Sequence, residues 1–181
     1  MKKLFVLVFV IALSLCALTI GASAASSAPA GGGTADNPYK IGTAEELKWF
    51  AGLVNGTLTD DTQQNSAACA VLTADIDLNG SAENKFTPIG ISGHYYTGTF
   101  DGMGCEIKGL YIDSNKNETK YVGLFGYIGE GGILRNIRVV DGSVSYSGYL
   151  STMDYNNYVG GICGYNNNGT ISGCYFRGKV F

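Results

Sequence analysis

A short glycine-rich stretch that recurs along the chain constrains its fold more than any other feature. Residues 121–128 read YVGLFGYI, and residues 158–165 read YVGGICGY. A fainter copy, YTGTF, covers residues 96–100. The opening tyrosine moves by 25 residues (121−96) and then by 37 (158−121), so the cores match while the connecting loops differ in length. Such a chain is expected to form a repeat architecture.

An apolar row follows each copy and predicts a β-strand. The shared pattern is apolar-x-x-apolar-x-apolar, and its last part alternates with the period of two that a strand requires. The expected equivalent positions are Ile107, Leu134 and Ile171, then Leu110, Ile137 and Cys174, then Ile112, Val139 and Phe176. Gly104, Gly132 and Gly169 each precede a row by three residues and permit the positive φ of a corner. Because one unit buries its row only against like units, the sequence predicts a parallel β-solenoid.

These motifs resemble those of GLUG-motif repeat proteins, which are bacterial surface and secreted proteins. The resemblance rests on GLFG at 123–126 and GICG at 161–164, and on the preceding segments 72–80, 86–90 and 98–102. It covers roughly residues 38–181 and implies an all-β fold, a right-handed parallel β-helix (solenoid). The implied function is a non-catalytic module, structural or adhesin-like, that binds host or glycan ligands. Some bacterial immunoglobulin A metallopeptidases also carry such repeats, so the motif marks a fold rather than an activity.

The N-terminus is typical of a secretory signal peptide. Lys2 and Lys3 precede an almost wholly apolar run over residues 4–20, and residues 22–24 (ASA) fit the small-x-small cleavage pattern. We expect cleavage after Ala24, a secreted or cell-surface location in a bacterium, and no transmembrane span afterwards; the alternative is an N-terminal membrane anchor. Residues 25–37 predict a flexible linker, and residues 38–181 the solenoid domain, incomplete at its C-terminus.

The charge balance argues against a nucleic-acid partner. The chain has 12 Lys and Arg against 15 Asp and Glu, a net charge of −3. Removing residues 1–24 takes away two lysines and no acidic residue, which leaves 10−15 = −5. Phosphate backbones and anionic membranes would be repelled by such a domain.

One amphipathic helix is predicted close to the start of the domain. Thr43 and Glu46 form a capping box, and an apolar face follows at helical spacing until Asn55 and Gly56 end the helix. Because solenoid ends need covering, we expect this helix to cap the first turn. A recognition helix is the alternative.

Asp75, Asp77 and Asn79 match the first half of a calcium loop, in which alternate oxygens converge before a glycine turn. The second half does not match, because position 12 holds Phe86 rather than a glutamate. We therefore expect a solvated strand face and no cofactor, with calcium as the alternative.

The sequence offers little catalytic chemistry. Its one histidine is His94, and it has neither a His-Glu-x-x-His motif nor a Gly-x-Ser-x-Gly elbow, so no catalytic residue is assigned and no enzyme is expected. The alternative class is a polysaccharide lyase, because some of these enzymes use right-handed β-helices; Asp75, Asp77 and Asp101 would then be acid or calcium candidates.

Aromatic residues in the long polar segment 141–157 are the predicted ligand contacts. They are Tyr146, Tyr149 and Tyr155, on what we expect to be an exposed loop. The alternative is that these rings pack back onto the solenoid.

The cysteines and the C-terminal residues complete the expectations. Cys69, Cys105, Cys163 and Cys174 remain after cleavage; secretion permits disulfides, but Cys174 stands in an apolar row, which favours a buried thiol. Only five residues (181−176) follow the third unit. We therefore expect an open edge that is covered by further repeats or by another protein.

Overall fold

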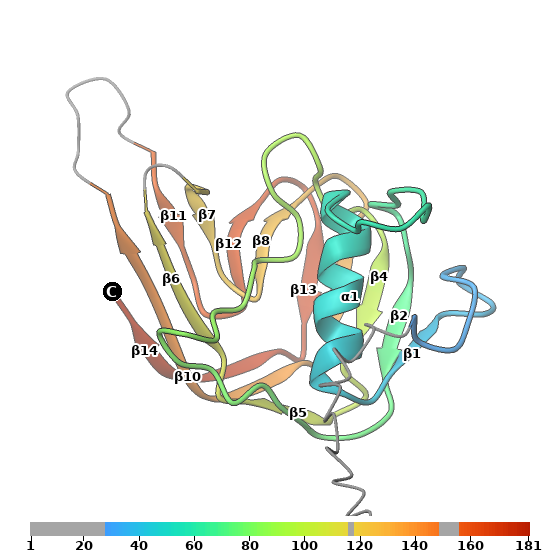
Figure 1. The fold of residues 1–181 in the computed structure, drawn as a ribbon, viewed down its shortest axis with the longest axis horizontal. Coiled ribbons are helices and arrows are strands. Elements are labelled where there is room, and N and C mark those ends of the chain that lie inside the picture. The colour runs from blue at the N-terminus through green and yellow to red at the C-terminus, as the bar shows by residue number, and fades with distance from the viewer. Residues whose placement is uncertain (1–27, 116–117, 149–155) are drawn as a thin grey trace, which may run out of the picture.

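In the computed structural model, strands coil into a parallel β-solenoid of about four turns with a single short helix (Figure 1). The structure describes residues 28–115, 118–148 and 156–181. All the strand pairs within this part are parallel, which confirms the predicted solenoid. Residues 28–37, from the predicted linker, contact the first turn: Ala30 O accepts a hydrogen bond from Lys40 N–H.

Two sheets carry most of the strands. The first has the order β1 (Tyr39–Ile41), β2 (Ala70–Leu72), β4 (Thr99–Asp101), β9 (Ile133–Arg135) and β13 (Thr170–Ser172). The second has the order β3 (Ile76–Asp77), β5 (Glu106–Lys108), β10 (Arg138–Ser147) and β14 (Tyr175–Val180), with β6 (Tyr111–Asn115) also paired to β10. Two short pairs complete the turns: β7 (Tyr121–Val122) with β11 (Tyr158–Val159), and β8 (Phe125–Ile128) with β12 (Cys163–Asn166).

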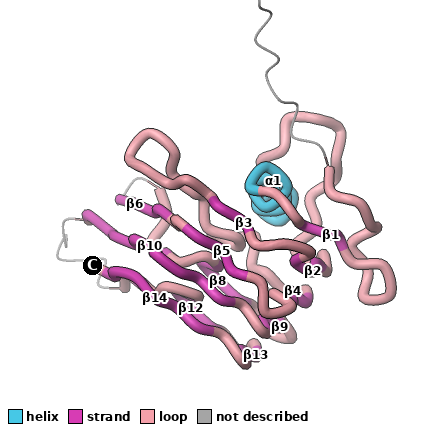
Figure 2. The backbone as a smooth tube through the Cα atoms, turned by 90° about the horizontal axis from the view of Figure 1, so that it is seen from below, coloured by secondary structure: helices cyan, strands magenta, loops and turns pink. Residues whose placement is uncertain are grey.

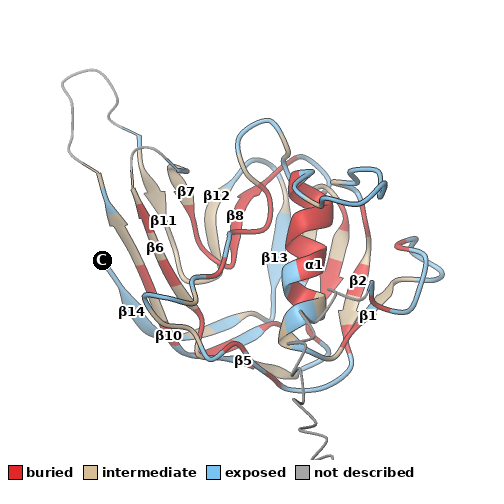
Figure 3. Ribbon diagram, viewed as in Figure 1, coloured by how far each residue is buried: buried red, intermediate tan, exposed pale blue. Residues whose placement is uncertain are grey.

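The core consists of inward side chains that stack from one turn to the next. In the first sheet the stacked row is Ala70, Phe100, Leu134 and Ile171. In the second sheet it is Ile76, Ile107, Val139 and Phe176. These rows form an apolar interior that is buried up to Leu134 and Val139, whereas β13 of the last described turn is exposed (Figure 3).

The predicted register of the first copy is wrong. Ile107 pairs with Ile76 and Val139, and Phe100 takes the place beside Leu134 that we expected for Ile107. Leu110 likewise does not stack with Ile137: its carbonyl accepts the N–H of Ser143, further along β10.

The corner glycine and the opening tyrosine of that copy shift in the same way. Gly98, not Gly104, is the counterpart of Gly132. The carbonyl of Gly98 accepts the N–H of Ile133, the first residue of β9, and the carbonyl of Gly132 accepts the N–H of Thr170, the first residue of β13. Tyr96 pairs with Ile128 rather than with Tyr121. The later register is confirmed, because Tyr121 pairs with Tyr158 and Leu134 with Ile171.

The helix α1 (Ala44–Asn55) covers the N-terminal end of the solenoid, as predicted. Thr43 Oγ1 accepts Glu46 N–H at 3.2 Å, and Glu46 Oε2 accepts Thr43 N–H at 3.1 Å, so the capping box is present. Phe50 packs its ring against those of Tyr96 and Phe100, with centroids 6.1 and 5.7 Å apart. Figure 2 shows α1 beside β1, β2 and β3, at the end of the stack away from β13 and β14.

Candidate functional site

The calcium candidates lie on a solvated strand face. Asp75 Oδ1 accepts the N–H of Glu106 at 2.8 Å, and Asp77 Oδ1 accepts the N–H of Asn79 at 2.9 Å. Ile76 and Leu78, which alternate with the aspartates, are buried. Across the described residues, no group of three or more His, Cys, Asp or Glu side chains could hold a metal ion. Calcium binding at Asp75, Asp77 and Asn79 was the alternative to the predicted solvated strand face, and it stays untested.

Asp101 lies in a hydrogen-bonded network at the end of β4. Its Oδ2 accepts Arg135 Nε at 2.7 Å, and its Oδ1 accepts Met103 N–H at 2.8 Å and Asn136 Nδ2 at 3.1 Å. Burial raises the pKa of this carboxyl, but the three hydrogen bonds outweigh that effect and the net pKa is lowered. Asp101 therefore joins neighbouring turns as a carboxylate, which is a structural arrangement.

Of the three predicted ligand contacts, the structure describes one. Tyr146 lies in β10, paired with Ser114 of β6, and its ring packs partly against the core. The exposed loop that we expected to begin at residue 141 is therefore strand up to Ser147. Tyr149 and Tyr155 lie outside the described residues.

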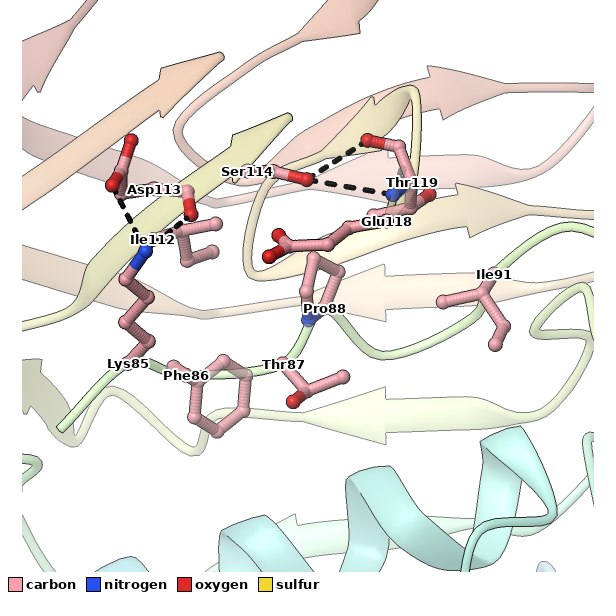
Figure 4. A pocket seen from close by; sticks show the side chains of 10 residues that line it. All are labelled: Lys85, Phe86, Thr87, Pro88, Ile91, Ile112, Asp113, Ser114, Glu118 and Thr119. Atoms are coloured by element: carbon pink, nitrogen blue, oxygen red, sulfur yellow. Dashed lines mark hydrogen bonds and ion pairs between the residues drawn. The ribbon is translucent and has the colours of Figure 1, made fainter. Parts of the chain in front are cut away.

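A hollow of about 310 Å³ lies beside β6 (Figure 4). Its apolar wall comes from Phe86, Pro88, Ile91 and Ile112. The chain before β4 makes one backbone hydrogen bond to β6, from Phe86 N–H to the carbonyl of Tyr111. It then diverges from that strand, and the hollow lies between them.

Four polar residues of this hollow bind one another in pairs, Lys85 with Asp113 and Ser114 with Thr119. Lys85 Nζ lies 2.9 Å from Asp113 Oδ2 and donates to the carbonyl of Asp113 at 3.1 Å. The side-chain hydrogen bond between Lys85 and the Asp113 carboxylate raises the pKa of Lys85 and lowers that of Asp113. Ser114 Oγ donates to the carbonyl of Thr119 at 3.0 Å. The hollow could hold a small apolar group; the charges of Lys85 and Asp113 are paired with each other, and the Glu118 carboxylate accepts a hydrogen bond from Asn115 Nδ2 at 3.0 Å.

A more extended feature is a cluster of five tyrosine rings on the outside of β7, β8 and their neighbours, which we call the tyrosine array. One row runs Tyr95, Tyr127, Tyr165 across neighbouring turns, and a second runs Tyr121, Tyr158. The rows touch within each turn: the ring centroids of Tyr121 and Tyr127 are 4.9 Å apart, and those of Tyr158 and Tyr165 are 4.6 Å apart.

The glycines of the motif bring the two rows together. A Cβ at Gly126 would lie 2.7 Å from the carbonyl oxygen of Tyr121, and one at Gly164 would lie 2.8 Å from that of Tyr158. Only glycine allows the chain to turn back this sharply between the two strands. The tyrosines that begin and end each motif copy therefore meet on the outer side of the corner.

The sequence contained a signal for the tyrosine array. In residues 121–128, inward-facing Val122 and Ile128 place the adjacent Tyr121 and Tyr127 on the opposite face of their strands, where Tyr121 is half-buried and neighbouring rings leave Tyr127 8% exposed. The ligand contacts predicted from the sequence came from the segment 141–157 and include none of these five rings. Tyr95 could not be assigned to the array, because its register depends on Tyr96 pairing with Ile128.

The four described cysteines, Cys69, Cys105, Cys163 and Cys174, are free thiols. Cys163 takes the inward place of Phe125 one turn on, and burial raises its pKa to about 12. A thiol of this kind behaves as a small hydrophobic side chain, not as a nucleophile.

The chain is similar to segments of two much longer proteins. The chain is 31% identical over 143 residues (77% of its length) to a protein of Evansella cellulosilytica named as a Gly-rich membrane protein, and it spans 16% of that protein. It is 31% identical over 156 residues (83% of its length) to halomucin of Haloquadratum walsbyi, and it spans 2% of that protein. No solved structure matches the chain. Among the described helices, none is long and apolar enough to cross a membrane.

The sequence profile of the GLUG motif matches residues 155–180, which contain β11, β12, β13 and β14. The second copy was recognised despite its extra glycine and despite Cys163 in place of Phe125. Residues 155–180 of this β-solenoid are thus a GLUG motif, and the resemblance drawn from the sequence is confirmed.

Proposed function

We propose that the chain is a non-catalytic structural module of a secreted or cell-surface bacterial protein, adhesin-like in that it presents its outer faces to extracellular ligands. The observation that carries this proposal is the continuous stacking of inward side chains, from Ala70 to Ile171 and from Ile76 to Phe176. Stacked turns of this kind form a stiff rod whose length grows with each turn. The names of the two relatives, a membrane protein and a halomucin, support a surface role.

The open end of the solenoid supports an extended assembly. Leu134 is fully buried, whereas Ile171, its counterpart in the last described turn, is 39% exposed. We propose that further repeats or another protein add a parallel turn there and cover this row. Since both relatives are much longer than the chain, further turns in one polypeptide are the favoured cover.

The paired carboxylates favour a structural role over the lyase alternative. A catalytic acid or base works best with a pKa close to the working pH, whereas the pKa of Asp101 is lowered and Asp75 holds a backbone N–H. No cofactor is part of the proposal.

Three experiments test the proposal. The full chain, produced in a bacterium that recognises its N-terminus, should be recovered from the medium or the cell envelope; recovery from the cytoplasm alone would contradict the surface role. The purified chain should release no unsaturated product from acidic polysaccharides in the presence of calcium. A β-elimination product that disappears in Asp101→Asn would make it an enzyme. Melting with calcium and then with a chelator checks the Asp75 site, where equal melting temperatures are expected.

A further inference from the structure

We propose that the tyrosine array is a binding surface for neutral polysaccharide chains. Sugar rings would pack their C–H faces on the exposed parts of the phenol rings, and sugar hydroxyls would bond to the phenol oxygens and to nearby amides. This inference rests on the proposed function, because a secreted or surface module meets extracellular glycans.

The first supporting observation is how different this surface is from the other outer faces. Outward positions of β5 and β10 carry Glu106 and Arg138, which form an ion pair at 2.9 Å, and β4 and β9 carry Asp101 and Arg135. Such paired charges suit a solvated strand face. The outer face of β7, β8, β11 and β12 instead carries stacked aromatic rings, which have a large apolar surface and a polar tip and are enriched where proteins bind ligands.

The second observation is the shape of the array. Its rings run along the solenoid from Tyr95, which is 40% exposed, to Tyr165 at the last described turn. Tyr121, Tyr158 and Tyr165 are each half-buried, whereas the central ring of Tyr127 is only 8% exposed and supports its neighbours from beneath. The rings contact one another, so they enclose no cavity for a small molecule. An elongated surface without a pocket fits a polymer that contacts several rings in succession.

The third observation is the charge and hydrogen-bonding character of the surroundings. Burial and the neighbouring phenols raise the pKa of Tyr127, which further favours the neutral phenol. The Asn167 side chain lies close enough to the Tyr127 phenol to act against this rise in its pKa, and further exposed asparagines, Asn156 and Asn168, lie close by in sequence. Amides and phenols both donate and accept hydrogen bonds, which matches a polymer rich in neutral hydroxyl groups.

The distribution of cations argues against an acidic polymer. Three arginines are held by carboxylates: Arg135 by Asp101, Arg138 by Glu106, and Arg177 by Asp141. At the array itself, the cation seen against a ring is Lys120, which lies 5.7 Å from the ring centroid of Tyr121. A uronic polymer would need several cations at its carboxylates.

The test uses affinity electrophoresis of the full chain in gels that contain a starch-type glucan, a cellulose-type glucan, a mannan or a xylan, and polygalacturonate as the acidic comparison. Migration should be retarded by at least one neutral polymer and not by polygalacturonate. Tyr95→Ala and Tyr165→Ala should each weaken that retardation about tenfold, as expected when one aromatic contact is lost. Tyr175→Ala is the matched control, because Tyr175 is 49% exposed but lies on β14, outside the array.

Every outcome of this experiment either supports or overturns the inference. Retardation by no neutral polymer, retardation by polygalacturonate alone, or equal weakening in Tyr175→Ala would overturn the inference. Binding of a proline-rich peptide instead of a glycan would also overturn it. If Tyr165→Ala does not fold, Tyr95→Ala decides, since Tyr95 is partly exposed and lies outside the named strands. A folded, secreted chain that binds none of these polymers would refute this inference alone and leave the proposed structural role intact.

Discussion

Equivalent side chains in neighbouring turns differ in what they contribute to stability because they differ in burial. Leu134 and Ile171 are register partners, but Leu134 is fully buried and Ile171 is 39% exposed. Leu134→Ala should lower the free energy of unfolding by about 2–5 kcal/mol, because it leaves a cavity between packed turns. Ile171→Ala should cost clearly less. Urea denaturation of both variants measures the difference, and equal losses would mean that the last turn is covered.

The Asp101 network should make stability depend on pH. The hydrogen bonds lower the folded pKa of Asp101 below its ordinary value of 3.8, so its contribution is complete above that pH and is lost as pH falls through the folded pKa. Asp101→Asn should therefore cost about 1–3 kcal/mol at pH 6 and progressively less below pH 4, where the wild-type carboxyl also becomes protonated. Urea denaturation at a series of pH values measures this convergence.

Asp113→Asn is the control for this prediction. Asp113 pairs with Lys85, but their side chains are 36% and 41% exposed, so solvent screens the pair. Its loss should change the free energy of unfolding by less than about 1 kcal/mol. A larger effect than that of Asp101→Asn would show that burial does not separate the two ion pairs as argued.

Among the structural elements, the corner between β4 and β5 explains why the predicted register failed. Phe100 and Ile107 are seven positions apart (107−100), whereas Leu134 and Val139, and also Ile171 and Phe176, are five apart (139−134 and 176−171). The two extra residues bulge at Met103 and Gly104, both with positive φ. The apolar spacing of Ile107, Leu110 and Ile112 repeats that of Leu134, Ile137 and Val139 by coincidence, and one sequence cannot distinguish the two alignments.

The helix shows the opposite outcome, because its signals are local. A capping box, a face of spacing 3.6 and a glycine stop define α1 without reference to any distant strand. The position of α1 could also be predicted from the sequence, because its apolar face, which carries Phe50, has to be buried against the open end of the first turn. Strand pairing depends on residues more than thirty positions apart, so a small change in a corner is enough to shift it.

The corner between β7 and β8 leads to a prediction about the GLUG glycines. A Cβ at Gly126 would meet carbonyl oxygens on two sides, 2.5 Å from that of Gly90 and 2.7 Å from that of Tyr121. Backbone atoms cannot move aside as a side chain does, so Gly126→Ala should cost about 3 kcal/mol. Gly131→Ala is the control: its φ is +79° but nothing lies within 4 Å of the added Cβ, and it should cost about 1 kcal/mol. Thermal melts compare them, and a milder effect at Gly126 would contradict the steric argument.

For the molecule as a whole, the sequence was sufficient for the fold class but not for the binding surface. Repetition of the motif predicts a solenoid whatever the exact alignment, because every alignment stacks apolar rows. The tyrosine array depends on which side of each strand a ring occupies and on which turns are neighbours. Those facts follow only once Tyr96 is known to pair with Ile128 and Tyr127 with Tyr165.

The last described turn should make the chain self-associate. Its strands β13 and β14 each pair on one side within the described residues, and Ile171, Val180 and Phe181 are 39%, 46% and 69% exposed. An uncovered parallel edge offers unpaired N–H and C=O groups next to an apolar row, and both favour contact with another chain. Residues 25–181 should therefore elute from size-exclusion chromatography as species that grow with concentration. Ile171→Lys should shift elution toward the monomer by placing a charge in the apolar row, whereas Ser172→Lys, on the exposed outer face of the same strand, should not. A wild-type monomer at high concentration with a cooperative melt would mean that the edge is already protected.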